Sequence, residues 1–184
     1  MVLADVFDEP ARLVRYTLAR YTSRTMNTLR FLLEEGEATG LLRQFIDGGG
    51  DVIALGGGPG FEVKAVSMYE MIRDRVGART GCSGSRVIVD LYAAHWKPIS
   101  EVVCSKVTHL AVEQGDIREE VLGGGRRLWF INFVMAENWA DLVPDEVEEA
   151  SGIHLKGAIV SIFKMAEVRE RLVVCYSINI HRCH

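Results

Sequence analysis

The chain has little of what marks several classes of protein. Its four cysteines are far apart and form no Cys-x-x-Cys pair, so reduced thiols are expected rather than disulfides or a structural zinc site. No uncharged run approaches the roughly 18 apolar residues that a membrane span requires, and the amino terminus has no basic stretch leading into an apolar one. The expectation is therefore a soluble cytoplasmic protein with no membrane partner.

The chain also lacks an excess of positive charge. It has 21 Lys and Arg against 25 Asp and Glu, a formal net charge of −4 and a pI of about 5.8. No domain-wide positive field exists to attract nucleic acid, although a local basic patch is compatible with this balance. With 184 residues, 48% of them hydrophobic and 25% charged, the composition is that of one globular domain over residues 1–184.

Glycine, in contrast, is abundant, with 18 residues that include triplets at 48–50, 56–58 and 123–125. Triplets punctuate a chain rather than fill a core. The first and the third precede apolar runs and are interpreted as loops. The second lies between a predicted strand and a predicted helix, where a turn of bare backbone favours a ligand.

Residues 9–46 are predicted to be helical, in one helix or in two that break near Gly36 and Gly40. Apolar side chains recur there at nearly 3.6-residue spacing, and we expect them to face the core: Val14, Leu18, Tyr21, Met26, Leu29 and Leu33. The arginines of this segment fall on the opposite half of the helix, as on a solvated face. Residues 1–50 are thus expected to form a helical cap on a core made by residues 51–184.

From residue 51 onward the pattern alternates between short apolar runs and helical periods. The predicted strands are 51–55, 86–91, 107–113, 128–134, 157–163 and 172–180. This alternation predicts an α/β fold, a Rossmann-like open and mostly parallel sheet with helices on both faces. Residues 164–170 are too few for a crossover helix, so we expect an antiparallel last strand paired with 157–163.

Two acidic residues at predicted strand ends add to the glycine turn. Asp90 lies at the end of the second strand, where a carboxylate accepts hydrogen bonds from ribose hydroxyls. Asp116 follows the third strand, in reach of an adenine amine. The turn reads G-x-G-x-G, with Phe61 where a dinucleotide fingerprint has its third glycine. The pattern therefore indicates an adenosine pocket.

These motifs resemble, in order over most of residues 51–163, the class I S-adenosylmethionine-dependent methyltransferases. The resemblance implies S-adenosylmethionine as the cofactor, with Asp90 on its ribose and Asp116 on its adenine amine. It further implies that Leu91 and Ile117 enclose the adenine ring. The glycine turn would line the methionine part of the cofactor through Gly56, Gly57, Gly58 and Gly60.

Methyl transfer chiefly requires alignment of the nucleophile and exclusion of water, and a proton acceptor helps where the nucleophile is protonated. Glu137, after the fourth strand, is the predicted catalytic residue, and Asn138 and His95 are the other candidates. The adenine-methylase signature is absent after that strand. The acidic pI favours a small-molecule acceptor over RNA or protein.

Two other functions stay open at the level of sequence. One is an NAD-dependent oxidoreductase on a similar sheet, which Phe61 and Asp116 disfavour. The other is a methyltransferase-like domain that binds without catalysing. No metal site is expected, since the donors near the carboxyl terminus, His181, Cys183 and His184, are typical of a frayed tail.

Overall fold

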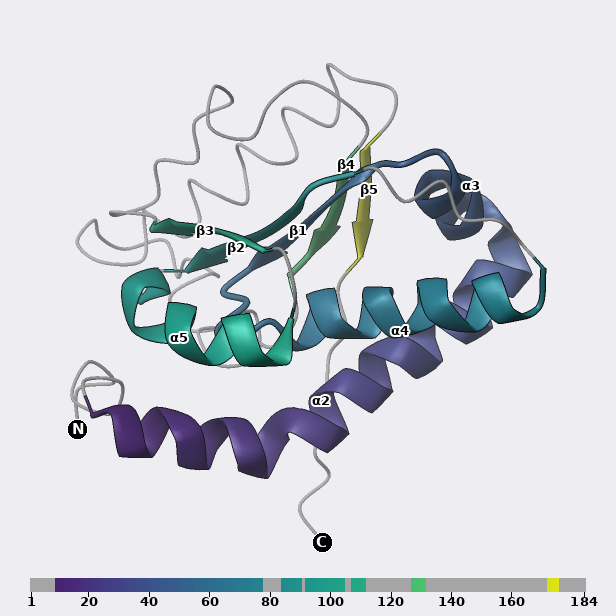
Figure 1. Cartoon of the computed structure of the whole chain (residues 1–184). Helices are drawn as coiled ribbons and strands as arrows, with labels where there is room; N and C mark the ends of the chain where they lie inside the picture. Colours follow the sequence, from purple (N-terminus) through teal and green to yellow (C-terminus); the bar gives the residue numbers. More distant parts are fainter. Residues whose placement is uncertain are drawn as a thin grey trace, which may run out of the picture.

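The computed structural model describes residues 9–77, 84–90, 92–104, 107–111, 127–131 and 172–175. Within these ranges the chain forms an α/β fold, in which helices pack against an open parallel sheet (Figure 1). In chain order the elements are α2 (Pro10–Thr39), α3 (Leu41–Asp47), β1 (Asp51–Leu55), α4 (Phe61–Arg75), β2 (Arg86–Asp90), α5 (Ala93–Val103), β3 (Thr108–Ala111), β4 (Arg127–Phe130) and β5 (Leu172–Cys175).

The described strands form one sheet in the order β3-β2-β1-β4-β5, and every neighbouring pair is parallel. The first four correspond to the strands predicted from residue 51 to residue 134. The chain moves outward from β1 through β2 to β3, and it then returns to place β4 on the other side of β1. The order therefore reverses beside β1, and all five strands end at the same edge of the sheet.

An antiparallel last strand is not found among the described residues. β5 pairs in parallel with β4, with Val173 opposite Leu128. The strand predicted at 157–163 lies outside the described residues. The prediction considered only the short connection 164–170, whereas the neighbour of β5 is β4. Residues 131–171 separate these two strands, far more than the dozen that a parallel crossover needs.

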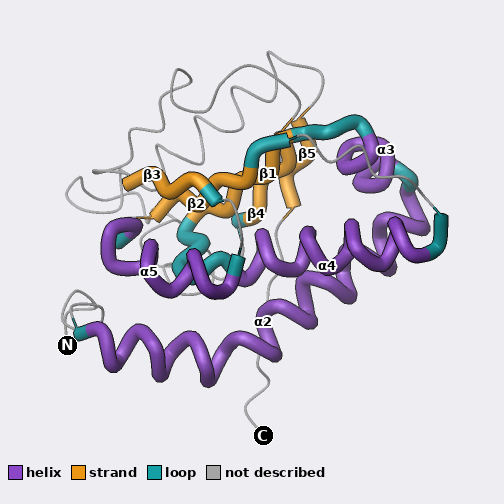
Figure 2. The backbone as a smooth tube through the Cα atoms, viewed as in Figure 1, coloured by secondary structure: helices purple, strands orange, loops and turns teal. Residues whose placement is uncertain are grey.

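Strand β1 is buried on both of its faces, as its continuous apolar run predicts. Val52 and Ala54 pack with residues of the helices, and Ile53, which points to the other face, is also fully buried. Figure 2 shows α2, α4 and α5 on one side of the sheet. Of the helices predicted on both faces of the sheet, the described residues show those on one face. None of the described helices is long and apolar enough to cross a membrane.

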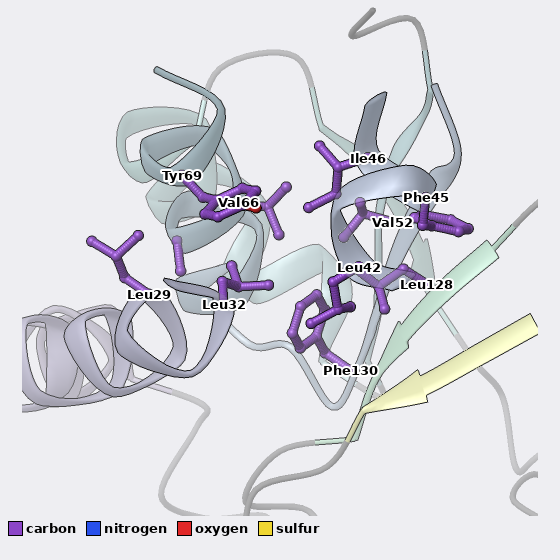
Figure 3. Close-up of a cluster of buried hydrophobic side chains, with 11 residues drawn as sticks. Leu29, Leu32, Leu42, Phe45, Ile46, Val52, Val66, Tyr69, Leu128 and Phe130 are labelled. Atoms are coloured by element: carbon purple, nitrogen blue, oxygen red, sulfur yellow. The ribbon is translucent and has the colours of Figure 1, made fainter. Parts of the chain in front are cut away.

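A cluster of buried side chains joins α2, α3 and α4 to the sheet, and Figure 3 shows these side chains converging. Its members are Leu29, Leu32, Leu42, Phe45, Ile46, Val52, Ala65, Val66, Tyr69, Leu128 and Phe130. Full burial of each large side chain contributes about 1.5 to 3 kcal/mol. Gly50 belongs to this packing, because a Cβ there would lie 2.1 Å from the Phe45 ring. The first glycine triplet thus serves the core.

The predicted inward face of α2 is wrong for three residues. Val14, Leu18 and Met26 are 47%, 75% and 47% exposed. Leu29 is buried as predicted, and the other buried positions are Leu13, Thr17, Thr25, Thr28 and Leu32. Each of the three exposed residues follows a buried residue directly, which is a rotation of about 100° on a helix. Threonine fills three of the buried positions, so an apolar count alone misplaces the face.

The buried threonines of α2 provide a matched test of this packing. The Thr25 hydroxyl is buried and has no hydrogen-bond partner in the described part of the chain, whereas the Thr17 hydroxyl donates to the Leu13 carbonyl at 2.8 Å. Thr25→Val removes an unsatisfied polar group and is expected to raise the free energy of unfolding by about 1 kcal/mol. Thr17→Val loses a hydrogen bond and is expected to lower it or leave it unchanged. Urea denaturation measures both, and a destabilised Thr25→Val would contradict the assignment.

Candidate functional site

The site begins with the turn that joins β1 to α4. Three of its glycines have a positive φ, 60° at Gly56, 46° at Gly58 and 88° at Gly60. Residues other than glycine rarely adopt such angles. At Gly57 a Cβ would lie 2.8 Å from the Cβ of Ala54. Glycine is therefore required at these four positions, by the backbone conformation at three of them and by the closeness of Ala54 at Gly57.

Gly60 packs tightly against the side chains of Ile88 and Cys104. A Cβ at Gly60 would lie 2.8 Å from Ile88 Cδ1 and 2.9 Å from Cys104 Sγ. The Cys104 thiol donates a hydrogen bond to the Gly60 carbonyl at 3.0 Å. Burial raises the pKa of Cys104 to about 12, so the thiol stays protonated and keeps this donor at neutral pH. Cys104 thus fixes the turn from below.

Asp90, the last residue of β2, is bonded to the turn. The backbone N–H of Gly58 donates to Asp90 Oδ2 at 2.9 Å, and the N–H of Tyr92 donates to Oδ1 at 2.8 Å. Burial raises the pKa of the Asp90 carboxyl, and the two N–H donors oppose that shift. Each carboxylate oxygen has a second acceptor position. Asp90 as a whole residue is half-buried, so those positions are candidates for the hydroxyl donors of a ligand.

Aromatic side chains close one side of the turn. Trp96 of α5 lies against Gly58, at 3.6 Å from where a Cβ would be. Tyr16 of α2 contacts both Trp96 and Phe61, with ring centroids 5.7 and 6.5 Å apart. Tyr21 meets Phe61 edge-on at 6.2 Å. The long helix therefore covers the turn through ring contacts, below the sheet in Figure 1.

The part of the site that stays exposed lies at the carboxyl ends of β1 and β2. Residues 57–60 are buried, whereas Gly56 is exposed and Asp90 is half-buried. A ligand that reaches this edge of the sheet meets bare backbone at Gly56 and a carboxylate at Asp90. This combination suits a hydroxyl-bearing molecule that approaches the main chain closely.

The structure brings together the predicted Gly56, Gly57, Gly58, Gly60 and Asp90. The other predicted site residues lie outside the described part of the chain: Leu91, Asp116, Ile117 and Glu137.

His95, the further candidate base, is exposed on α5, with its ring 6.2 Å from that of Tyr92. Within the described ranges, no three His, Cys, Asp or Glu residues group as metal ligands.

Sequence reasoning missed two buried residues beside the turn, Cys104, which bonds to it, and Glu62. Glu62 lies in the first turn of α4 and is only 4% exposed. The sequence did contain a signal for Glu62. An acidic residue two positions after the last glycine falls at a helix N-terminus, which favours negative charge. Cys104 had no such signal, since its contact with Gly60 spans 44 positions of the sequence.

No protein-family model, no curated protein and no solved structure matches this chain. Its function is therefore inferred from the chemistry of the site itself.

Proposed function

We propose that the chain is an S-adenosylmethionine-dependent methyltransferase with a Rossmann-like core. The observation that carries the proposal is the hydrogen bond from the Gly58 N–H to the Asp90 carboxylate. It joins a turn of bare backbone to an acidic strand end, the two parts that a nucleoside site needs at this edge. In this proposal Asp90 accepts hydrogen bonds from the ribose hydroxyls.

The strand order supports a ligand at this place. In open α/β sheets, ligands bind outside the carboxyl ends of the strands, where the strand order reverses. Here the order reverses beside β1, and the glycine turn follows β1 directly. The described order β3-β2-β1-β4-β5 is also the one that nucleotide-binding sheets of this class use.

The spacing of the turn supports S-adenosylmethionine over a dinucleotide. A third fingerprint glycine would let the helix pack closely on the sheet. Phe61 takes that position and is 2% exposed, with its ring centroid 6.5 Å from that of Tyr16 and 6.2 Å from that of Tyr21. As the family resemblance implies, Asp116 would then bind the adenine amine, and Leu91 and Ile117 would enclose the ring.

S-adenosylmethionine supplies a methyl group already activated by a positively charged sulfur. The protein has to hold that cofactor, orient the acceptor and exclude water. The turn and Asp90 would hold the nucleoside, and the aromatic group of Tyr16, Phe61 and Trp96 keeps water from one side of the turn. Glu137 is proposed to take the proton of the attacking group, and the acceptor is proposed to be a small molecule.

Transfer of a labelled methyl group tests the proposed activity. The protein is incubated with methyl-labelled S-adenosylmethionine and separate fractions of cell metabolites, RNA and protein. Label is expected in the metabolite fraction, and Gly60→Ala serves as a variant with a damaged turn. Cofactor binding without transfer to any fraction would show a non-catalytic binding module instead.

The raised pKa of Asp90 predicts how binding of S-adenosylmethionine depends on pH. An ionised carboxylate accepts from both ribose hydroxyls, and protonation removes acceptor capacity. Affinity is therefore expected to fall as the pH drops through a pKa above the ordinary value of about 3.9. Titrations from pH 7.5 to pH 4.5 measure the loss. Asp90→Asn has no such titration, so an equal decline in that variant would show that another group is responsible.

A further inference from the structure

A row of three arginines and one tyrosine on α2 borders the glycine turn. Arg12, Tyr16, Arg20 and Arg24 are four residues apart in a continuous helix and so share one slanting face. The Arg24 guanidinium lies over the Tyr16 ring, 5.4 Å from its centroid. Tyr16 in turn contacts Trp96, which lies against Gly58. The row is thus connected to the turn by ring contacts.

The stretch of sequence that bears this row is poor in acidic residues. No acidic residue occurs between Pro10 and Phe31. Arg12 pairs with Glu9 at 2.9 Å on the surface. Arg20 is exposed, and its guanidinium has no partner among the residues that the structure describes. It lies between Tyr16 and Arg24 in this row, on the face of α2 from which Tyr16 contacts the rings beside the turn.

Arg15 is a natural comparison on the same helix. It is also exposed and has no side-chain partner within the described ranges. Five residues separate it from Arg20, which places it about 140° away around the helix. It is close in sequence to the exposed Val14 and Leu18, and it lies outside the row that contains Tyr16. The two arginines therefore differ in position and not in charge or exposure.

We propose that this α2 row binds phosphate groups of the methyl acceptor, so that the acceptor is a phosphate-bearing molecule. This inference rests on the proposed function and names the substrate class of the same site. Guanidinium groups bind phosphate through two parallel hydrogen bonds, which makes arginine the residue best suited to such a row. From Arg12 to Arg24 the row spans roughly 18 Å, long enough for more than one phosphate. The same phosphate chemistry occurs in a small phosphorylated metabolite, the acceptor class proposed above, and in an RNA strand, and the test distinguishes the two.

Two probes distinguish these sources without the cofactor. Tripolyphosphate represents a small phosphorylated molecule, and a fluorescein-labelled single-stranded RNA of 12 nucleotides represents a strand. RNA binding is followed by fluorescence anisotropy, and tripolyphosphate binding by calorimetry. At least one probe is expected to bind the wild type, and the affinity of RNA should fall steeply with salt if the strand is the true ligand.

Arg20→Ala is expected to weaken the bound probe about tenfold, whereas Arg15→Ala changes it less than twofold. Arg20→Lys should recover part of the affinity. Absence of binding by both probes, or equal losses in the two alanine variants, would overturn the inference. Both arginines are exposed, so circular dichroism should show an unchanged fold.

Affinity for S-adenosylmethionine, measured on the same samples, should be the same in Arg20→Ala and wild type. If the wild type binds a phosphate probe but not S-adenosylmethionine, the proposed function fails while the phosphate-binding row stands.

Discussion

Replacement of Asp90 by alanine is expected to weaken S-adenosylmethionine binding by about 1.5 to 3 kcal/mol, roughly a ten- to hundredfold rise in Kd. The variant loses the proposed ribose acceptor, and it also leaves the N–H groups of Gly58 and Tyr92 without their carboxylate. Both effects act at the carboxyl edge of β1 and β2. Isothermal titration calorimetry at neutral pH measures the change.

Asp51→Ala is the matched control for this experiment. Asp51 also accepts a backbone hydrogen bond, from the Ser85 N–H at 2.7 Å, but it begins β1 and so lies at the opposite edge of the sheet. Its removal is expected to leave the Kd for S-adenosylmethionine unchanged within twofold. Similar losses in Asp51→Ala and Asp90→Ala would indicate general loosening of the sheet. An unaltered Kd in Asp90→Ala would refute the ribose role.

Gly60→Ala is expected to destabilise the fold by about 2 to 5 kcal/mol. A φ of 88° costs a residue with a Cβ about 1 to 2 kcal/mol. The new Cβ would also overlap Ile88 Cδ1 and Cys104 Sγ, and overpacking of a buried contact adds about 1 to 3 kcal/mol. The shift of the midpoint in urea denaturation, at unchanged m-value, measures the sum.

Gly40→Ala separates the two contributions to this loss. Gly40 has a φ of 66°, and nothing lies within 4 Å of where its Cβ would be. Gly40→Ala is therefore expected to lose only the stability that the positive φ costs, about 1 to 2 kcal/mol. Equal destabilisation by Gly40→Ala and Gly60→Ala would show that Gly60 is not packed against Ile88 and Cys104. In that case the turn would be held less tightly than the contacts indicate.

The central part of the fold was predictable from local pattern. Short apolar runs bounded by glycine or by acidic residues predict β1 and β2, because strands buried on both faces need apolar side chains at every position. The convergence of the turn with Asp90 was predictable for a related reason. Parallel neighbours end at the same edge, so a glycine turn after β1 and an acid that ends β2 meet there.

Other features depend on contacts that no local pattern encodes. The buried face of α2 uses Thr17, Thr25 and Thr28, and a helical wheel assigns such side chains to solvent as readily as to the interior. Pairing of β5 with β4 depends on which strand edge is open, not on the nearest segment in sequence. The ring contacts of Tyr16 with Phe61 and Trp96 likewise arise only when α2 crosses the turn.

The most direct test is a pair of calorimetric titrations of the wild-type chain at neutral pH, one with S-adenosylmethionine and one with NADH. Saturable 1:1 binding of S-adenosylmethionine, with no heat of binding from NADH, is the predicted outcome. Binding of NADH alone would instead make the chain a nicotinamide-binding protein. Absence of binding in both titrations would mean that the hydrogen bond between Gly58 and Asp90 stabilises the edge of the sheet and is not part of a nucleoside site.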